Sequence, residues 1–264
     1  PCVFCNQLFK FGLFLDYLVQ HEQTDYLATG HYAEKKYLNG AYQLRIPKDT
    51  LNDQTYFLHQ LNQKQLSRIR WPLSPLTKEE VRWKAQSLGL DNWSTKSSTD
   101  ICFLQGQRPL EFLKKHIPQN PGMIREAETN QIVGEHIGLP FYTLGQRKHL
   151  HIGGVKGFPE KPWFVVKKDE VNNTLLVSQR NSLLRFPTLL AHKVNWIAGD
   201  PPSEQFKCEA VIRYRGQRYP ANVKVHKDQT LYVVFQKAIA GITPGQYVVF
   251  YDKDICLGGG EITA

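Results

Sequence analysis

The 264-residue chain has the composition of a folded protein with a marked basic excess. Hydrophobic residues make up 41% and charged residues 22%, with no long run of one charge, which excludes a disordered profile. A net charge of +9 favours a polyanionic partner, although a protein that is merely basic is the alternative. We expect no membrane span, because no stretch approaches the ~18 apolar residues that a span needs. No signal peptide is recognisable either, so a cytoplasmic location follows. Because the chain begins at Pro1 and not at Met, we expect it to be a fragment.

Five cysteines are scattered along the chain. In a reducing cytosol this odd number argues against a structural disulfide framework and leaves packing, metal binding or chemistry. A second closely spaced ligand pair is missing from the sequence, so Cys2-x-x-Cys5 predicts no zinc site. A redox pair and a packed thiol stay open for Cys5. Cys102, in a polar loop entering an apolar segment, is equally a candidate thiolate or a half-buried packed thiol. The remaining cysteines are Cys208 and Cys256.

The first part of the chain reads as mixed α/β. Apolar residues at helical spacing predict an amphipathic helix over 8–20, followed by a short buried strand over 26–29 that ends in Gly30-His31. A helix feeding such a strand is typical of the last unit of an α/β sheet, where ligands collect at the carboxyl ends of strands. Asn39-Gly40 predicts a hairpin turn, and the spacing of Thr77 and Glu80 predicts a capped helix. We expect this module to span residues 1–107.

The rest of the chain is rich in short strands. After a helix over 108–116, a hairpin joins 163–166 to 175–177, and we assign residues 108–182 to a β-rich central domain. Strands are then predicted at regular spacing, which suggests a small antiparallel β-barrel over 183–264. These strands are 191–196, 208–214, 221–225, 231–235 and 247–251. Gly258-Gly259-Gly260 lacks the strand-turn-helix setting of a nucleotide fingerprint.

Several separate segments, in order, resemble the tRNA-specific 2-thiouridylases, which modify the wobble uridine of certain tRNAs. Any one segment is weak, but eight in register across the whole chain are specific. They are PCVFCN at 1–6, ATGHYA at 28–33, NDQTYFL at 52–58, STDICF at 98–103, TLGQRK at 143–148, the hairpin from PWFVVKKD to LLVSQ, RYR at 213–215, and TPGQYVVFY with CLGGGEI.

The resemblance implies ATP-dependent sulfur transfer to C2 of uridine in tRNA. In the family ATP adenylates the C2 oxygen, a persulfide sulfur attacks C2, and a second thiol releases that sulfur by forming a disulfide. It further implies Mg²⁺ with the ATP, a protein that relays sulfur, and tRNA as partner. For the fold it implies the C-terminal remnant of a pyrophosphate-loop ATPase α/β domain, the central domain and the barrel.

Carried over residue by residue, the resemblance assigns Cys5 as the nucleophile and Cys102 as the persulfide carrier. Gly30 matches a nucleotide contact, where a missing Cβ allows close approach. The resemblance also implies that tRNA is contacted by His31, by the 52–54 segment, by Arg213 and Tyr214, and by Gln246. Without a ligand, His31 would be a packed histidine and the 52–54 segment a helix N-terminal cap. Arg213 and Tyr214 would then simply alternate along a barrel strand. The 52–54 segment consists of Asn52, Asp53 and Gln54.

Two departures from the family bear on function. The glycine- and serine-rich pyrophosphate loop is missing from this sequence, which puts ATP use by this chain alone in doubt. Many members carry Asp where this chain has Cys2, which places a rival thiol beside Cys5. The alternatives are therefore a catalytically incomplete tRNA-binding module, one part of a two-chain thiolase, or a thiol redox protein without RNA.

Overall fold

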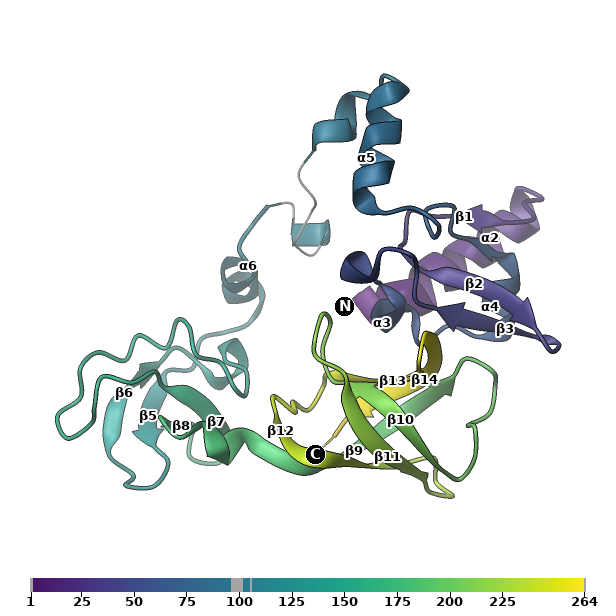
Figure 1. Ribbon diagram of the computed structural model, residues 1–264. Helices are drawn as coiled ribbons and strands as arrows, with labels where there is room; N and C mark the ends of the chain where they lie inside the picture. Colours follow the sequence, from purple (N-terminus) through teal and green to yellow (C-terminus); the bar gives the residue numbers. More distant parts are fainter. Residues whose placement is uncertain (1, 96–101, 105, 264) are drawn as a thin grey trace. The chain divides into compact units, whose positions relative to one another are not determined.

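The computed structural model describes residues 2–95, 102–104 and 106–263, which fall into two compact units (Figure 1). The first unit combines residues up to Thr99 with Thr188–Gln236 and Gly245–Thr263. The second holds Asp100–Pro187 and Lys237–Pro244. The beginning and the end of the chain therefore share one unit, although they are far apart in sequence.

The first unit opens with a helical run whose middle is widened. It consists of α1 (Cys2–Phe4), a π-helix (Cys5–Leu13) and α2 (Phe14–His21), so the predicted helix is confirmed and begins earlier than expected. Gly12 leaves helical geometry, with φ −100° and ψ −106°. The Gln65 amide donates to the carbonyl oxygens of Gln7 and Phe11, at 3.0 and 2.9 Å. This side chain satisfies backbone acceptors that the widened turn frees.

The same helical run corrects one expectation from the sequence. Cys2–His21 is 20 residues long and reaches a mean hydropathy of 1.3, so by length and composition alone it passes the test for a membrane span. A core helix of a folded domain passes the same test. Phe11 and Leu15 are buried in the apolar core of the first unit, but only 22% of the apolar window is buried, less than in a core helix.

A short parallel sheet and several small helices follow. β1 (Leu27–Ala28) pairs in parallel with β4 (Ile69–Arg70), which confirms the predicted strand in shortened form. Its predicted burial is wrong, because Leu27 is half-buried and Ala28 is exposed. The capping box predicted from Thr77 and Glu80 is present, with Glu80 N donating to Thr77 Oγ1 at 3.2 Å. The helices of this part are a 3₁₀ turn (Thr50–Asn52), α3 (Thr55–Leu58), α4 (Gln63–Arg68), α5 (Lys78–Ser87) and a second 3₁₀ turn (Asp91–Ser94).

Six strands close into a β-barrel, as the strand spacing predicted. Their order is β13-β10-β11-β12-β9-β14, and β13 also pairs with β14, which closes the ring. The strands are β9 (Arg185–Trp196), β10 (Gln205–Val211), β11 (Tyr219–Val225), β12 (Leu231–Ala240), β13 (Tyr247–Asp252) and β14 (Ile255–Ile262).

Sequence analysis missed β14, because its glycine run has low strand propensity. The structure explains these glycines by close backbone packing. A Cβ on Gly258, whose φ is +137°, would collide with the carbonyl oxygen of Asn195. One on Gly259 would collide with the carbonyl oxygen of Val248, and one on Gly260 would lie 2.8 Å from that of His192. The glycines therefore let β14 fit between its neighbours.

The predicted Asn39-Gly40 hairpin is confirmed, and it extends the barrel sheet. β2 (Glu34–Leu38) pairs with β3 (Ala41–Arg45), and the turn residues have φ of 53° and 82°, as a type I′ turn requires. β3 then pairs with β14 at Cys256. The hairpin thus joins the barrel strands and not β1 and β4.

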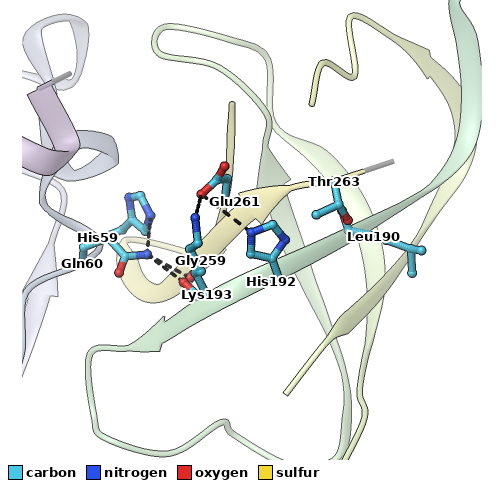
Figure 2. Close-up of polar contacts among 8 residues, drawn as sticks. All are labelled: His59, Gln60, Leu190, His192, Lys193, Gly259, Glu261 and Thr263. Atoms are coloured by element: carbon cyan, nitrogen blue, oxygen red, sulfur yellow. Dashed lines mark hydrogen bonds and ion pairs between the residues drawn. The ribbon is translucent and has the colours of Figure 1, made fainter. Parts of the chain in front are cut away.

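Helix α3 is attached to the barrel through a buried polar group (Figure 2). His59 Nδ1 lies 2.7 Å from the carbonyl oxygen of Tyr56, and Gln60 Nε2 lies 3.1 Å from His59 Nε2. The same Gln60 amide reaches the carbonyl oxygens of Lys193 and Gly259, both at 3.4 Å. Nearby, Lys193 forms an ion pair with Glu261 at 2.9 Å (Figure 2).

The second unit contains a four-stranded sheet with the order β6-β5-β8-β7. β5 and β8 are parallel and the other pairs antiparallel, and the predicted β7–β8 hairpin is confirmed. Ile124, Val165 and Leu175 form the centre of its core. The elements are a 3₁₀ turn (Cys102–Leu104), α6 (Pro109–His116), β5 (Gly122–Glu126), β6 (Ile132–His136), a 3₁₀ turn (Leu139–Phe141), β7 (Phe164–Asp169), β8 (Thr174–Ser178) and a 3₁₀ turn (Asn181–Leu184).

Candidate functional site

Cys5 lies where the first helical turn passes into the π-helix. It is half-buried, and the next two residues are anchored to α3 and its C-terminal end. Asn6 donates to the carbonyl oxygen of Phe57 at 3.2 Å, and Gln7 donates to Gln60 Oε1 at 3.3 Å. The Cys5 thiol is therefore held on a fixed backbone while keeping partial access to solvent.

Cys102 lies in the second unit, at the start of the 3₁₀ turn Cys102–Leu104, and its side chain is exposed. The polar residues proposed to stabilise a thiolate, 97–101, lie outside the described residues. Cys5 and Cys102 thus belong to different units, and their meeting in space stays a prediction.

The two thiols in the barrel strands are poor nucleophiles. Cys208 lies in β10, and burial with nearby Glu209 and Asp252 raises the pKa of its thiol to about 12. Cys256 is fully buried in β14, and burial raises its pKa further still. Because the thiolate is the reactive form, both are structural at neutral pH.

Gly30 and His31 follow directly after β1, at the carboxyl end of the parallel pair. A Cβ added to Gly30 would meet only Leu73 Cδ1, at 3.7 Å, so the fold itself does not require glycine there. His31 Nδ1 lies 2.8 Å from Thr29 Oγ1, and its ring packs 5.5 Å from that of Phe11. Burial, with Lys10 nearby, lowers the pKa of His31 to about 4. The imidazole is therefore neutral at physiological pH.

The segment 52–54 is tied to the segment after β1. Gln54 Oε1 accepts from the backbone N–H of Tyr32 at 2.9 Å, and Gln54 N–H donates to the Tyr32 carbonyl at 2.9 Å. Asp53 accepts from the backbone N–H and the hydroxyl of Thr55, at 2.9 and 2.8 Å, just before α3. The N-cap of α3 is Gln54, whose side chain makes no cap bond, so the helix-cap alternative is not met. Burial raises the pKa of Asp53. The predicted contacts His31 and Gln54 are thus brought close by backbone pairing.

Arg213 and Tyr214 do not lie on a strand. The strand predicted over 208–214 ends at Val211, and a turn follows in which Arg215 has φ of +57°. Arg213 is exposed. The Tyr214 ring is half-buried and lies 4.2 Å from that of Phe57, so one of its faces is used for packing. Strand alternation therefore does not explain either residue.

Gln246 lies just before β13 and is exposed. Its carbonyl oxygen accepts from Ile262 N–H at 2.7 Å, while its side chain faces solvent. The backbone is held by the barrel, and the side chain is available to a ligand.

A cavity of about 430 Å³ lies between the 46–56 segment and the barrel and brings two predicted contacts, Asp53 and Tyr214, together. Three cations that sequence analysis did not assign also line it: Arg215, Arg218 and Lys253. Arg215 donates to Asn52 Oδ1 at 3.3 Å, which links it to the predicted 52–54 contacts. The basic run RYRGQR was the available signal. The full lining is Ile46, Thr50, Leu51, Asp53, Tyr56, Val211, Tyr214, Arg215, Gly216, Arg218, Tyr251, Lys253 and Asp254.

Known domain families match the chain in three consecutive parts. Residues 1–106 match the tRNA methyl transferase HUP domain, and residues 110–179 match the tRNA methyl transferase PRC-barrel domain. Residues 186–262 match the aminomethyltransferase β-barrel domain, in agreement with the closed barrel.

Curated relatives match almost the whole chain. The tRNA-specific 2-thiouridylase MnmA of Buchnera aphidicola is 44% identical over 99% of this chain and 72% of its own length. MnmA 1 of Geobacillus kaustophilus is 45% identical over 99% of this chain and 70% of its own length. MnmA of Nitrosomonas eutropha is 45% identical over 100% of this chain and 73% of its own length. The chain therefore belongs to the tRNA-specific 2-thiouridylase family.

Proposed function

We propose that this chain is a tRNA-specific 2-thiouridylase, a sulfurtransferase that replaces the C2 oxygen of the wobble uridine with sulfur. The observation that carries the proposal is the identity of 44–45% with 2-thiouridylases over nearly the whole chain. The basic charge of +9 and the cationic cavity beside the 52–54 segment support a tRNA substrate. A cytoplasmic location and a protein that delivers sulfur belong to the same proposal.

In this proposal Cys102 carries the sulfur and Cys5 releases it. The exposed Cys102 receives a sulfur atom as a persulfide, whose terminal sulfur attacks C2 of the uridine. The Cys5 thiolate then attacks Cys102 Sγ and breaks the persulfide S–S bond. The terminal sulfur stays on C2, and a Cys5–Cys102 disulfide forms. Anchoring through Asn6 and Gln7 keeps Cys5 in place for that attack.

The residues after β1 fit one side of an adenine nucleotide. Gly30 is open to solvent, and only Leu73 would lie near an added Cβ, so a ligand can approach its backbone. ATP, when bound, would supply the adenylyl group that makes the C2 oxygen a leaving group. The described residues contain no group of three or more His, Cys, Asp or Glu side chains suited to a metal ion.

We further propose that the α/β part is the C-terminal remnant of a larger nucleotide-binding sheet. Within the described residues β1 pairs only with β4, so the two outer edges of this parallel pair are without strands. The helical run Cys2–His21 also exposes large apolar side chains, which a further layer would cover. They are Phe4, Leu8, Phe9, Leu13, Phe14 and Tyr17.

Substitution of the thiols tests the proposed chemistry. Cys5→Ser and Cys102→Ser should each abolish thiolation of tRNA by the enzyme expressed from its whole reading frame. Cys208→Ser and Cys256→Ser are matched controls, because both thiols lie in barrel strands and have raised pKa values, and they should retain activity. The measurement is 2-thiouridine in tRNA by mass spectrometry. Thiolation by Cys102→Ser would contradict the persulfide assignment.

The alternative is a tRNA-binding module that does not turn over or that needs a second chain for ATP. The two outer edges of the β1–β4 pair favour it if no further strands are supplied. ATP-dependent AMP formation in the presence of tRNA separates the cases. Tight tRNA binding without AMP would support the binding module.

A further inference from the structure

Cys2 is the thiol for which the proposed reaction has no use. Of the five cysteines, Cys208 and Cys256 lie in barrel strands and have raised thiol pKa values, and Cys5 and Cys102 have assigned roles. Cys2 is half-buried, like Cys5, and lies in the same unit. The juxtaposition of Cys2 and Cys5 therefore does not depend on how the two units are arranged.

The helical geometry gives the two cysteines the Cα separation that a disulfide requires. Cys2–Phe4 is α-helical, and Phe4, with φ −59° and ψ −45°, continues the helix into Cys5. Residues three apart on a helix lie on the same face, with Cα atoms about 5 Å apart. A disulfide needs Cα atoms roughly 4.4–6.8 Å apart, so Cys2 and Cys5 meet that requirement without unfolding the helix.

The backbone around this pair is fixed on the side of Cys5. Val3 is buried, Asn6 is bonded to the Phe57 carbonyl, and Gln65 holds the Gln7 carbonyl. The backbone of Cys5 is held in place, and Cys2, one helical turn before it, is always adjacent. An intramolecular partner at this range has a high effective concentration.

We propose that Cys2 is the resolving thiol of the enzyme, which removes Cys5 from its disulfide with Cys102 after each sulfur transfer. This inference rests on the proposed function. The Cys2 thiolate attacks Cys5 Sγ, the Cys5–Cys102 S–S bond breaks, and a Cys2–Cys5 bond forms. Cys102 leaves with the electron pair and takes up the proton that Cys2 lost. A dithiol reductant then reduces the Cys2–Cys5 disulfide and is itself oxidised.

This exchange gives the two units separate tasks. Cys102 becomes a free thiol at once and can accept the next sulfur atom, while the oxidation remains on the helix of the first unit. The chain therefore needs a reductant only at an accessible pair three residues apart. A direct reduction of the Cys5–Cys102 bond is no longer required.

Peptide mapping provides the first test. The tryptic peptide that ends at Lys10 contains both Cys2 and Cys5, and a disulfide between them makes it lighter by two hydrogen atoms. After one round of thiolation and rapid alkylation, this lighter peptide should accumulate, with Cys102 alkylated. In Cys2→Ser the same peptide should instead be cross-linked to the peptide that contains Cys102. A wild-type enzyme that keeps the Cys5–Cys102 cross-link would overturn the proposal.

Kinetics provides the second test and separates this inference from the proposed function. With a dithiol reductant, Cys2→Ser should complete the first turnover, but its later turnovers should slow several-fold. Cys208→Ser is the control for loss of a thiol and should match the wild type in both phases. Absence of a first turnover in the wild type contradicts the proposed function. A normal first turnover with equal later rates in Cys2→Ser contradicts only the role of Cys2.

Discussion

The barrel and the α/β part lie in the same unit, but they differ in how many of their strand edges are paired with a neighbouring strand. In the barrel every strand has two neighbours, because β13 pairs with both β10 and β14. In the α/β part, as far as the structure describes it, β1 and β4 pair only with each other. Closure of a sheet removes its edges, whereas a two-stranded sheet depends on outside support.

This difference separates residues that serve stability from residues for which we propose a role in binding or catalysis. The glycines of β14 are required by neighbouring backbone atoms, whereas an added Cβ at Gly30 would meet only Leu73 Cδ1. The barrel thiols Cys208 and Cys256 have raised pKa values, and Cys256 is fully buried, whereas Cys102 is exposed. Residue type alone therefore does not reveal a role; packing density around the residue does.

The largest expected effect comes from adding a methyl group at a barrel glycine. Gly258→Ala would place a Cβ against the carbonyl oxygen of Asn195, on backbone with φ of +137°. Because neither the space nor the conformation suits alanine, we expect a loss of more than about 3 kcal/mol in the free energy of unfolding. Urea denaturation followed by circular dichroism measures it.

Gly30→Ala is the matched control for that substitution. Its new Cβ would meet only Leu73 at 3.7 Å, so the free energy of unfolding should change by less than about 1 kcal/mol. Thiolation should nevertheless fall if the backbone of Gly30 approaches a nucleotide. Equal destabilisation by the two substitutions would remove the distinction between barrel and α/β part.

The second effect concerns pH and the attachment of α3 to the barrel. Burial lowers the pKa of His59 to about 4, from an ordinary value of 6.5. The unfolded chain therefore takes up a proton first, so stability is complete above pH 6.5 and declines as the pH falls toward 4. The loss amounts to roughly 3 kcal/mol. His31 adds a contribution of the same sign.

The check is the slope of unfolding free energy against pH in the wild type and in His59→Leu. We expect a shallower slope in the variant between pH 6.5 and pH 4, whatever its absolute stability. Equal slopes would mean that His59 is accessible to protons in the folded state.

The third effect is at the cavity, where Tyr214 packs on Phe57. Tyr214→Ala should lower the free energy of unfolding by about 1–3 kcal/mol, because it removes a ring 4.2 Å from its neighbour. It should also weaken tRNA binding, with the dependence on salt unchanged, since no phosphate contact is lost. Tyr214→Phe keeps the ring and should retain stability. Filter binding at several salt concentrations completes the test.

The smallest effect is expected from single cations at the same place. Arg215→Ala should make the plot of log affinity against log salt shallower by about one unit or less, because one phosphate contact is removed. Arg213→Ala tests the originally predicted contact in the same series. A change for Arg215 but not for Arg213 would place the RNA at the cavity and not beside it.

Local signals in the sequence predicted most elements of the fold. The Asn39-Gly40 turn, the capping box of Thr77 and Glu80 and the regular strand spacing all act over a few residues, and the structure confirms each. The prediction was wrong where tertiary packing overrides propensity. β14 forms although its glycines disfavour strands, and Arg213 and Tyr214 leave the strand that their alternation suggested.

The candidate site was less accessible to sequence analysis. The motifs predicted which residues take part in catalysis and tRNA binding. The cavity, however, forms between segments about 160 positions apart in the sequence. The hydrogen bond from Arg215 to Asn52, for example, joins residues 163 positions apart. Nothing local relates such segments, so Lys253 carried no signal of its own, and the run RYRGQR was the only sign of Arg218. The roles of Cys5, Cys102 and the tRNA contacts stay predictions, as do the domain boundaries at 107 and 182.

The pairing of β3 with β14 sets the order in which the protein can be completed during synthesis. Arg45 bonds Asp254 across 209 positions, and the neighbouring strand β14 ends at Ile262. While the ribosome adds the intervening residues, the outer edge of the β2–β3 hairpin has no strand beside it. Contacts this distant in sequence form slowly and late. We therefore expect nascent chains that end before residue 255 to bind chaperones through this hairpin, and full-length chains to be released.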